Sequence, residues 1–278
     1  MSRNFFEGWY FKHQNKYDTV SLIPGISSSG AFIQVITDNE SFNVDFPKQQ
    51  FHNKSENIVL GKNIFSFKEI MLDINTEDLK AKGNIAYKNL TPLKNDIMGP
   101  FRFFSMECRH AVISMHHKLS GSLEINGKAY DFENGTGYIE KDSGYSFPKR
   151  YAWVQSNDFS EKCSIMAAVA DIPFFLLHFE GIICAIYYKG KEYRLATYNG
   201  AKVIECNSKK IKIANKDLCL EIYVAEYKSH SLLAPKSGKM SNTIKEAPSC
   251  NARFKFFKNN TLVFDMESDK SSCEFVGY

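Results

Sequence analysis

The sequence predicts an all-β chain of two tandem antiparallel barrels or sandwiches. Apolar and polar residues alternate with period two rather than 3.6, most clearly at Lys210–Ile213 and Arg253–Phe256, and this alternation is typical of a half-buried strand. Aromatic residues make up 14% of the chain, and bulky rings favour sheets over helices. At 278 residues, an all-β chain most simply forms two such domains.

Short runs rich in β-branched, aliphatic and aromatic residues carry the strand prediction. They lie at Val20–Ile23, Ala31–Thr37, Phe42–Phe46, Leu79–Tyr87, Ala111–Leu119, Tyr151–Gln155, Ile165–Ala170, Ile182–Tyr188, Leu218–Ala225 and Thr261–Met266. Two turn signals separate neighbouring runs. Asn126-Gly127 supplies the two left-handed positions of a type I′ hairpin turn, and Lys189-Gly190 indicates a second hairpin.

Three segments depart from this strand pattern. Asp171–Phe179, which contains Pro173, is expected to form a short helix, and the polar stretch Ser229–Ser249 is expected to be a surface loop or a lid. The seam between domains is placed near Asp142–Gly144, at the midpoint of the chain. The predicted domains are therefore residues 1–142 and 143–278.

Composition excludes several classes of function. The net charge is only +4 and no basic block is present, so nucleic acid is an unexpected partner. No secretory leader and no apolar run of about 20 residues is visible, which predicts a soluble, cytoplasmic protein. The seven cysteines form no Cys-x-x-Cys pair, which indicates reduced thiols and no structural zinc. Motifs for a serine nucleophile, a dinucleotide or a phosphate loop are also missing.

Both tryptophans lie in dense aromatic segments that also carry charges. Phe5–Lys12 contains Trp9, and Gly137–Gln155 contains Trp153. Flat amphipathic rings beside charged groups suit a site that holds a large apolar molecule while acting on its polar end.

The segment Met106–Leu119 holds further candidate side chains. If it is one unbulged strand, Glu107, Arg109 and His117 share the apolar face, and the face with His110 is solvated. Charges on an apolar face are costly unless they are paired or line a wet cavity. The segment therefore predicts either a structural ion pair or a polar spot in a cavity, and one bulge would exchange the faces.

The run Tyr138–Asp142 places two carboxylates on either side of a lysine. Surface ion pairs explain such a run more often than acid–base catalysis does.

These segments resemble the tocopherol cyclase family. Phe6–Lys12 is similar to the family's N-terminal Phe-Glu-Gly-Trp-Tyr-Phe signature. Glu140-Lys141, Gly144 and Phe147–Asn157 resemble its central block, Glu-Lys-Asn-Trp-Gly followed by Phe-Pro-Arg-Lys-Trp-Phe-Trp-Val-Gln-Cys-Asn. Weaker likeness continues through the Tyr188–Tyr193 hairpin and the Leu233–Pro235 turn.

The chain also departs from the family's central block. Asp142-Ser143 replaces Asn-Trp, Tyr151-Ala152 replaces Trp-Phe, and Ser156 replaces Cys. Fewer rings remain, so a substrate other than the plant type is expected. The resemblance implies two lipocalin-like domains and, more distantly, a likeness to carotenoid hydratases and fungal Diels–Alder cyclases.

The resemblance implies an intramolecular isomerisation. An acid protonates a prenyl double bond of a quinol-type substrate, and the phenolic oxygen closes a chromanol-type ring on the tertiary cation. Such chemistry requires a matched acid, aromatic faces that stabilise the cation, and exclusion of water. It requires no metal or redox cofactor. The implied partner is a lipophilic small molecule, with peripheral membrane contact as a further expectation and no prediction of oligomeric state.

Site residues follow from the resemblance and from their chemistry. The candidate acids are Glu7 and Glu107, with Glu140 and His117 behind them. The candidate substrate-binding residues are Trp9, Tyr10, Lys141, Arg150, Trp153 and Gln155.

Two other functions remain open. The chain could be a non-catalytic binder of a lipophilic molecule, or a hydratase in which water captures the same cation. The tryptophans could also be rings that seal barrel ends, with Arg150 packed on Trp9 as in lipocalin-type barrels.

Overall fold

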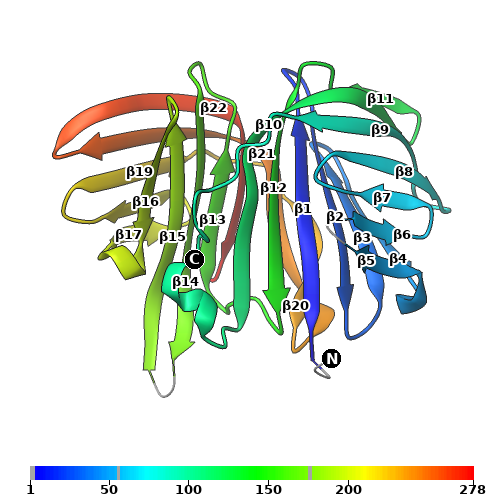
Figure 1. Cartoon of the computed structure of the whole chain (residues 1–278), viewed down its shortest axis with the longest axis horizontal. Coiled ribbons are helices and arrows are strands. Elements are labelled where there is room, and N and C mark those ends of the chain that lie inside the picture. Colours follow the sequence, from blue (N-terminus) through cyan, green and yellow to red (C-terminus); the bar gives the residue numbers. More distant parts are fainter. Residues whose placement is uncertain (1–3, 55–56, 175–176) are drawn as a thin grey trace. The chain divides into compact units, whose positions relative to one another are not determined.

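The computed structural model describes residues 4–54, 57–174 and 177–278, and its strands form two antiparallel sheets (Figure 1). The first sheet has the order β4-β3-β2-β1-β12-β10-β9-β8-β7-β6-β5, with β11 paired to β10. Its strands are β1 (Phe6–Gln14), β2 (Thr19–Ser27), β3 (Ala31–Thr37), β4 (Ser41–Phe46), β5 (Phe51–Lys54), β6 (Asn57–Leu60), β7 (Asn63–Phe65), β8 (Glu69–Asn75), β9 (Lys80–Lys88), β10 (Cys108–Ile125), β11 (Lys128–Asp131) and β12 (Thr136–Gly144).

The second sheet has the order β16-β15-β14-β13-β22-β21-β19-β18-β17, with β20 paired to β21. Its strands are β13 (Tyr151–Ser156), β14 (Cys163–Phe174), β15 (Leu177–Tyr188), β16 (Lys191–Ala196), β17 (Lys202–Asn207), β18 (Lys210–Ala214), β19 (Leu218–Val224), β20 (His230–Lys236), β21 (Lys239–Lys258) and β22 (Thr261–Val276). Three short 3-10 helices complete the described part of the chain: η1 (Lys48–Gln50), η2 (Gly99–Phe103) and η3 (Thr197–Asn199). None of the described helices is long and apolar enough to cross a membrane.

The all-β prediction is confirmed, and each predicted strand coincides with an observed one, with only Leu79 and Ala225 one residue outside. Both hairpin predictions are confirmed as well. At the first hairpin Ile125 pairs with Lys128, and Asn126 and Gly127 have φ of 48° and 83°. At the second, Tyr188 pairs with Lys191 across Lys189-Gly190.

Contacts divide the chain into two compact units. Unit 1 comprises Met1–Pro92, His110–Ser146 and Leu232–Thr243, and unit 2 comprises Leu93–Arg109, Phe147–Ser231 and Ile244–Tyr278. Each unit thus includes a segment from the other half of the sequence. The simpler partition into residues 1–142 and 143–278 stays a prediction.

Each unit buries one face of its strands in its own hydrophobic core. We call this the inner face and the opposite side of the same strands the outer face. In unit 1 the inner face includes Trp9, Phe11, Leu119 and Ile139. In unit 2 it includes Val154 and Phe254, among others. Alternate residues of these strands therefore lie on the outer face.

The helix predicted for Asp171–Phe179 is wrong. Strands β14 and β15 continue their antiparallel pairing through this segment, with Asp171 opposite Glu180 and Ile172 opposite Phe179. Residues 175–176 of the predicted helix lie outside the described residues. Because both neighbouring runs are apolar strands, extending the ladder pairs backbone groups that a nine-residue helix would leave open at both ends.

The loop or lid predicted for Ser229–Ser249 is also wrong, because β20 and the first half of β21 form a hairpin there. Ser237 and Gly238 make its turn, with φ of 51° and 79°. In unit 1 the Gln34 side chain holds this hairpin by donating to Leu233 O at 3.0 Å and accepting from Leu233 N at 2.7 Å. Polar composition predicted a loop, whereas backbone pairing is indifferent to side-chain polarity.

Candidate functional site

Strands β1 and β12 are neighbours, so the first aromatic segment pairs with the Gly137–Gly144 part of the second. Trp9 lies opposite Lys141, Tyr10 opposite Glu140, and Gly8 opposite Asp142. Side chains of directly opposite residues on one face lie about 5 Å apart at Cβ. The pairing therefore creates two different groups of side chains, one on each face of the same two strands.

The inner-face group consists of Glu7, Trp9 and Lys141. Lys141 forms an ion pair with Glu7, and its Nζ lies 4.6 Å from the centroid of the Trp9 ring. The cation on Trp9 is therefore Lys141; the expected Arg150 partner is wrong, since Arg150 pairs with Glu180 at 3.1 Å. Because Lys141 holds Glu7 beside the Trp9 ring, this geometry favours a positioning role for Glu7.

The outer-face group is centred on His110 of β10, the strand next to β12. His110 Nδ1 lies 2.9 Å from Asp142 Oδ1, and Nε2 lies 3.3 Å from Glu140 Oε2. The imidazole side chain is only 11% exposed. The prediction that the face with His110 is solvated is wrong, because Val112 and Ser114 on that face are buried too.

The charge state of His110 follows from its two carboxylate neighbours. Burial lowers its pKa, but the charges of Glu140 and Asp142 and the hydrogen bond to Asp142 raise it, and the net pKa lies well above the ordinary value. The imidazolium donates a hydrogen bond from Nδ1 to Asp142, whereas Nε2 lies within ion-pair distance of Glu140 without an aligned hydrogen bond. The result is a buried carboxylate–imidazolium–carboxylate cluster, which we call the acid cluster.

Aromatic rings lie on the same outer face as the acid cluster. The Tyr138 hydroxyl donates to Glu140 Oε2 at 2.6 Å, and its burial, with the nearby Glu140 charge, raises the pKa of Tyr138 well above its ordinary value. Tyr10, directly opposite Glu140, accepts a hydrogen bond from Ser21 at 2.8 Å. Opposite Asp142, Gly8 has no side chain, and a Cβ there would meet nothing nearer than Phe32 at 4.0 Å. Asp142 is therefore opposite bare backbone, with the Phe32 ring nearby.

Two further histidines, His13 and His117, lie on the inner face of the same sheet. His13 Nδ1 lies 3.2 Å from the carbonyl of Val20, and Nε2 lies 2.6 Å from the Tyr87 hydroxyl. Because a carbonyl only accepts, Nδ1 carries the proton and Tyr87 donates to Nε2. Burial, opposed by the Val20 hydrogen bond, lowers the pKa of His13 to about 3. This histidine is neutral.

His117 is the second member of this inner pair. Its ring centroid lies 4.6 Å from that of Tyr87, and its Nδ1 lies 3.2 Å from Ser114 Oγ. Its Nε2 has no hydrogen-bond partner among the described residues. The ring lies against the bare backbone of Gly137, where any Cβ would overlap it. Burial, with the nearby His13 and His116, lowers the pKa of His117 well below its ordinary value, so it holds no spare proton at neutral pH.

The remaining sequence candidates lie in unit 2. Glu107 precedes β10, and its partial burial raises its pKa against the opposing charges of Lys149 and His178. Trp153 and Gln155 alternate with the inner-face residue Val154 on β13, so they lie on its outer face, and both are buried. The pairing of β13 with β22 places Trp153 opposite Glu274.

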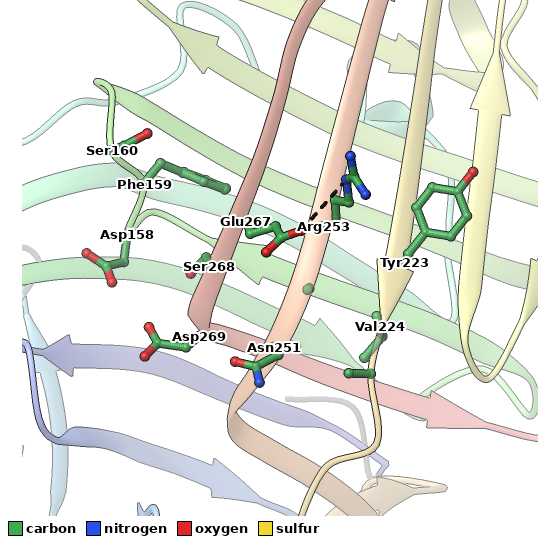
Figure 2. A pocket seen from close by; sticks show the side chains of 12 residues that line it. Asp158, Phe159, Ser160, Tyr223, Val224, Asn251, Arg253, Glu267, Ser268 and Asp269 are labelled. Atoms are coloured by element: carbon green, nitrogen blue, oxygen red, sulfur yellow. Dashed lines mark ion pairs between the residues drawn. The ribbon is translucent and has the colours of Figure 1, made fainter.

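A surface pocket of about 810 Å³ lies in unit 2 (Figure 2). Its lining includes Phe159, Tyr223, Arg253, Glu267 and Asp269, and none of the predicted site residues is among the lining residues. Arg253 is held by Asp265, with atoms 2.7 Å apart. The pocket is therefore formed by residues of unit 2, whereas the acid cluster belongs to unit 1.

The acid cluster is also the group with metal-ligand geometry in the described part of the chain. Candidate ligand atoms of His110, Glu140 and Asp142 all lie within 4.8 Å of one another. A metal would need an imidazole lone pair and would displace a proton from the His110 ring. The ion pairs of His110 with both carboxylates equally fit a proton-handling site.

Sequence reasoning named Glu140 as a candidate acid and weighed Asp142 with it, but left Asp142 and His110 out of the candidate site residues. The alternation Tyr138-x-Glu140-x-Asp142 puts the three on one face of a strand, and this signal was available. The pairing of β10 with β12, which brings His110 to that face, was not visible in the local pattern.

Comparison with known proteins places the chain in a family. Residues 78–277 match the family model described as tocopherol cyclase-like, which covers most of the chain, including the acid cluster. The chain belongs to the tocopherol cyclase-like family. It is 32% identical over 109 residues to the rice (Oryza sativa subsp. japonica) protein named "Probable tocopherol cyclase, chloroplastic", covering 37% of this chain. It is 30% identical over 109 residues to the chloroplastic tocopherol cyclase of Zea mays.

These matches span only 23% of the rice protein and 22% of the maize protein.

Solved structures share the fold at low identity. They include a Nitrosomonas europaea protein designated AttH (TM-score 0.56, 12% identity, 100% of this chain and 94% of that chain) and kievitone hydratase from Nectria haematococca (0.55, 11%, 99% and 89%). CghA is similar too (0.62, 6%, 99% and 89%). The chain thus shares the lipocalin-like all-β fold of these solved structures.

Proposed function

We propose that the chain is a tocopherol cyclase-like enzyme that protonates a prenyl double bond of a lipophilic quinol-type substrate and closes a chromanol-type ring. The observation that carries this proposal is the buried imidazolium of His110 between Glu140 and Asp142, on a face that also presents aromatic rings. Membership of the tocopherol cyclase-like family supports the same reaction class.

The charge of the acid cluster suits it to hold one transferable proton. Two carboxylates and one imidazolium sum to a single negative charge, and one further proton makes the buried cluster neutral. Burial favours the neutral form because it penalises net charge. Glu140 Oε2 accepts a hydrogen bond from Tyr138, whereas the Asp142 side chain is 22% exposed and lies opposite the bare backbone of Gly8. We therefore assign the transferable proton to Asp142, the more accessible carboxyl of the cluster.

The reaction balances without an added reagent. Asp142 gives its proton to the less substituted alkene carbon, and a tertiary cation forms on the neighbouring carbon. The phenolic oxygen attacks that cation and forms the C–O bond, and its O–H proton returns to the Asp142 carboxylate. Hydrogen bonding from His110 stabilises this carboxylate between the two transfers.

Rings on the outer face supply the second requirement. Tyr10 lies opposite Glu140, and Phe6, two positions from Gly8, lies opposite Gly144. Both are buried. Aromatic faces stabilise a nearby cation by about 0.5–2 kcal/mol each, and burial of the face excludes water that would trap it.

A test in heavy water separates the three candidate functions. Purified protein is incubated with prenylated hydroquinones of several chain lengths, without added cofactor, in D₂O containing ¹⁸O-labelled water. Cyclisation gives a chromanol with a single carbon-bound deuterium and no ¹⁸O. A tertiary alcohol that contains ¹⁸O would show the hydratase reaction instead. Tight binding with no turnover across the series would leave the binder function and contradict the cyclase proposal.

A further inference from the structure

We propose that Arg102–Phe104, together with Arg109, forms a docking surface for an anionic phospholipid membrane. Phe103 is 77% exposed and Phe104 is 52% exposed. Other large exposed apolar residues, such as Tyr17, Met71 and Ile204, stand singly along the chain. Isolated exposed apolar residues are ordinary, whereas adjacent ones indicate an interaction surface. The inference is independent of the proposed function.

The segment that carries these phenylalanines is held firmly in unit 2. Arg194 donates to the carbonyls of Asn95 and Asp96 at 2.8 and 2.7 Å, and the Tyr198 hydroxyl donates to Ile97 O at 3.1 Å. Gly99, at φ 54°, lies so close to Tyr198 that a Cβ would overlap the ring. The exposed rings are thus presented on an anchored backbone, which reduces the entropy cost of inserting them.

Phe101 fixes the base of this surface. Its ring stacks on Phe179 of β15 with centroids 6.0 Å apart, and it also contacts Phe104 at 6.4 Å and Tyr198 at 6.5 Å. Helix η2 is accordingly drawn beside the β14–β15 hairpin (Figure 1). Phe104 packs against Phe101 and is half-exposed, whereas Phe103 points to solvent and nothing described in the structure covers it.

The charges next to the exposed rings are positive. The Arg102 guanidinium lies 4.6 Å from the Phe103 ring centroid, and Arg109 donates to the Arg102 carbonyl. Among the described residues neither guanidinium forms an ion pair with a carboxylate. The nearby carboxyl of Glu107 faces the cations Lys149 and His178, so the local balance remains positive.

This chemistry matches the interface of an anionic bilayer. Aromatic rings enter the boundary between headgroups and acyl chains, while arginines stay at headgroup level and bind phosphate bidentately. Each basic residue near an anionic surface contributes about 1 kcal/mol, or about fivefold in affinity. Two exposed rings and two unpaired guanidiniums therefore favour a lipid surface over a purely apolar partner.

The test measures binding to phospholipid vesicles by sedimentation. Vesicles of phosphatidylcholine alone are compared with vesicles that contain about 30% phosphatidylglycerol. The protein should bind the anionic vesicles, and binding should weaken with salt. The double substitution Phe103→Ser and Phe104→Ser should lower affinity by roughly tenfold or more, and Arg102→Gln with Arg109→Gln by a similar factor.

A matched control comes from unit 1, where Tyr17 is 76% exposed and Lys16 lies 5.6 Å from its ring. Lys16→Gln with Tyr17→Ser should leave vesicle binding unchanged. Phe103→Trp replaces one exposed ring by another and therefore should not disturb folding. Because the native tryptophans are buried, a blue shift of the fluorescence emission on adding anionic vesicles reports insertion of the new tryptophan. The proposal is overturned if the wild-type protein does not bind anionic vesicles, if the control variant loses as much affinity as the Phe103 and Phe104 variant, or if the tryptophan emission does not shift. If the Phe103 and Phe104 substitutions abolish self-association of the protein and leave vesicle binding unchanged, the surface binds protein and the lipid proposal is wrong.

Discussion

Unit 1 contains two histidine clusters on opposite faces of one sheet, and they are held in opposite charge states. On the outer face, His110 is an imidazolium between Glu140 and Asp142. On the inner face, His13 and His117 are neutral among Tyr87 and other rings. All are buried, so burial alone does not decide the charge. The presence or absence of a carboxylate partner does, and only the outer cluster is equipped to move a proton.

The largest expected effect is on catalysis. Asp142→Asn removes the transferable proton while keeping the shape of the side chain, and turnover of the prenylated hydroquinone should fall by roughly 10²- to 10⁴-fold. His110→Gln should cause a comparable loss because it removes the donor that stabilises the returned carboxylate. The measurement is single-turnover chromanol formation.

Glu7→Gln provides the control on the inner face. Glu7 is ion-paired with Lys141 over Trp9, so its loss should alter KM more than kcat if it positions substrate. If Glu7→Gln abolishes turnover while Asp142→Asn retains it, the acid has been assigned to the wrong face.

The second largest effect is a loss of folding stability at acid pH, caused by the inner-face histidines His13 and His117. The folded-state pKa of His13 is about 3 and that of His117 is also lowered, against an ordinary value of 6.5. Below pH 6.5 the unfolded chain binds more protons, so stability falls as pH falls, by about 1.4 kcal/mol per pH unit for each histidine. The window for His13 extends from pH 6.5 down to about 3.

Urea denaturation between pH 6 and pH 4.5 measures this slope. His117→Gln should reduce it by one histidine's share relative to wild type, since one proton-binding site is lost from the unfolded chain. An unchanged slope would mean that His117 is already protonated in the folded protein.

The contrast between the faces also marks the limit of sequence reasoning. Strand runs and the Asn126-Gly127 hairpin were predictable because their signals are local. The pairing of β1 with β12 joins residues more than a hundred positions apart, and no local pattern specifies it. Glu140 was found from the family motif, but His110 was placed on a solvated face because the partner strand was unknown. The helix at Asp171–Phe179 failed because tertiary pairing overrode a weak local signal.

A smaller effect concerns the hydrogen bond that fixes the tautomer of His13. Tyr87→Phe removes the hydroxyl that donates to His13 Nε2 at 2.6 Å and leaves a buried acceptor unpaired, which should cost about 1–3 kcal/mol of unfolding free energy. In the double variant Tyr87→Phe with His13→Leu, much of that loss should return because neither polar group remains. Purely additive losses in this double-mutant cycle would show that the hydrogen bond contributes nothing specific.

The smallest effect has the opposite sign and belongs to the outer cluster. The folded-state pKa of His110 is raised above 6.5, so its contribution to stability is fully present below pH 6.5 and is lost as pH rises through the folded value. Between pH 6.5 and about 8, below the ordinary pKa of cysteine, wild-type stability should decline by at most about 1.4 kcal/mol per pH unit. His110→Gln should flatten this decline while leaving the acid slope of the inner pair intact. If His110→Gln instead changes the acid slope, His110 is neutral in the folded protein, and the difference in charge between the two faces does not exist.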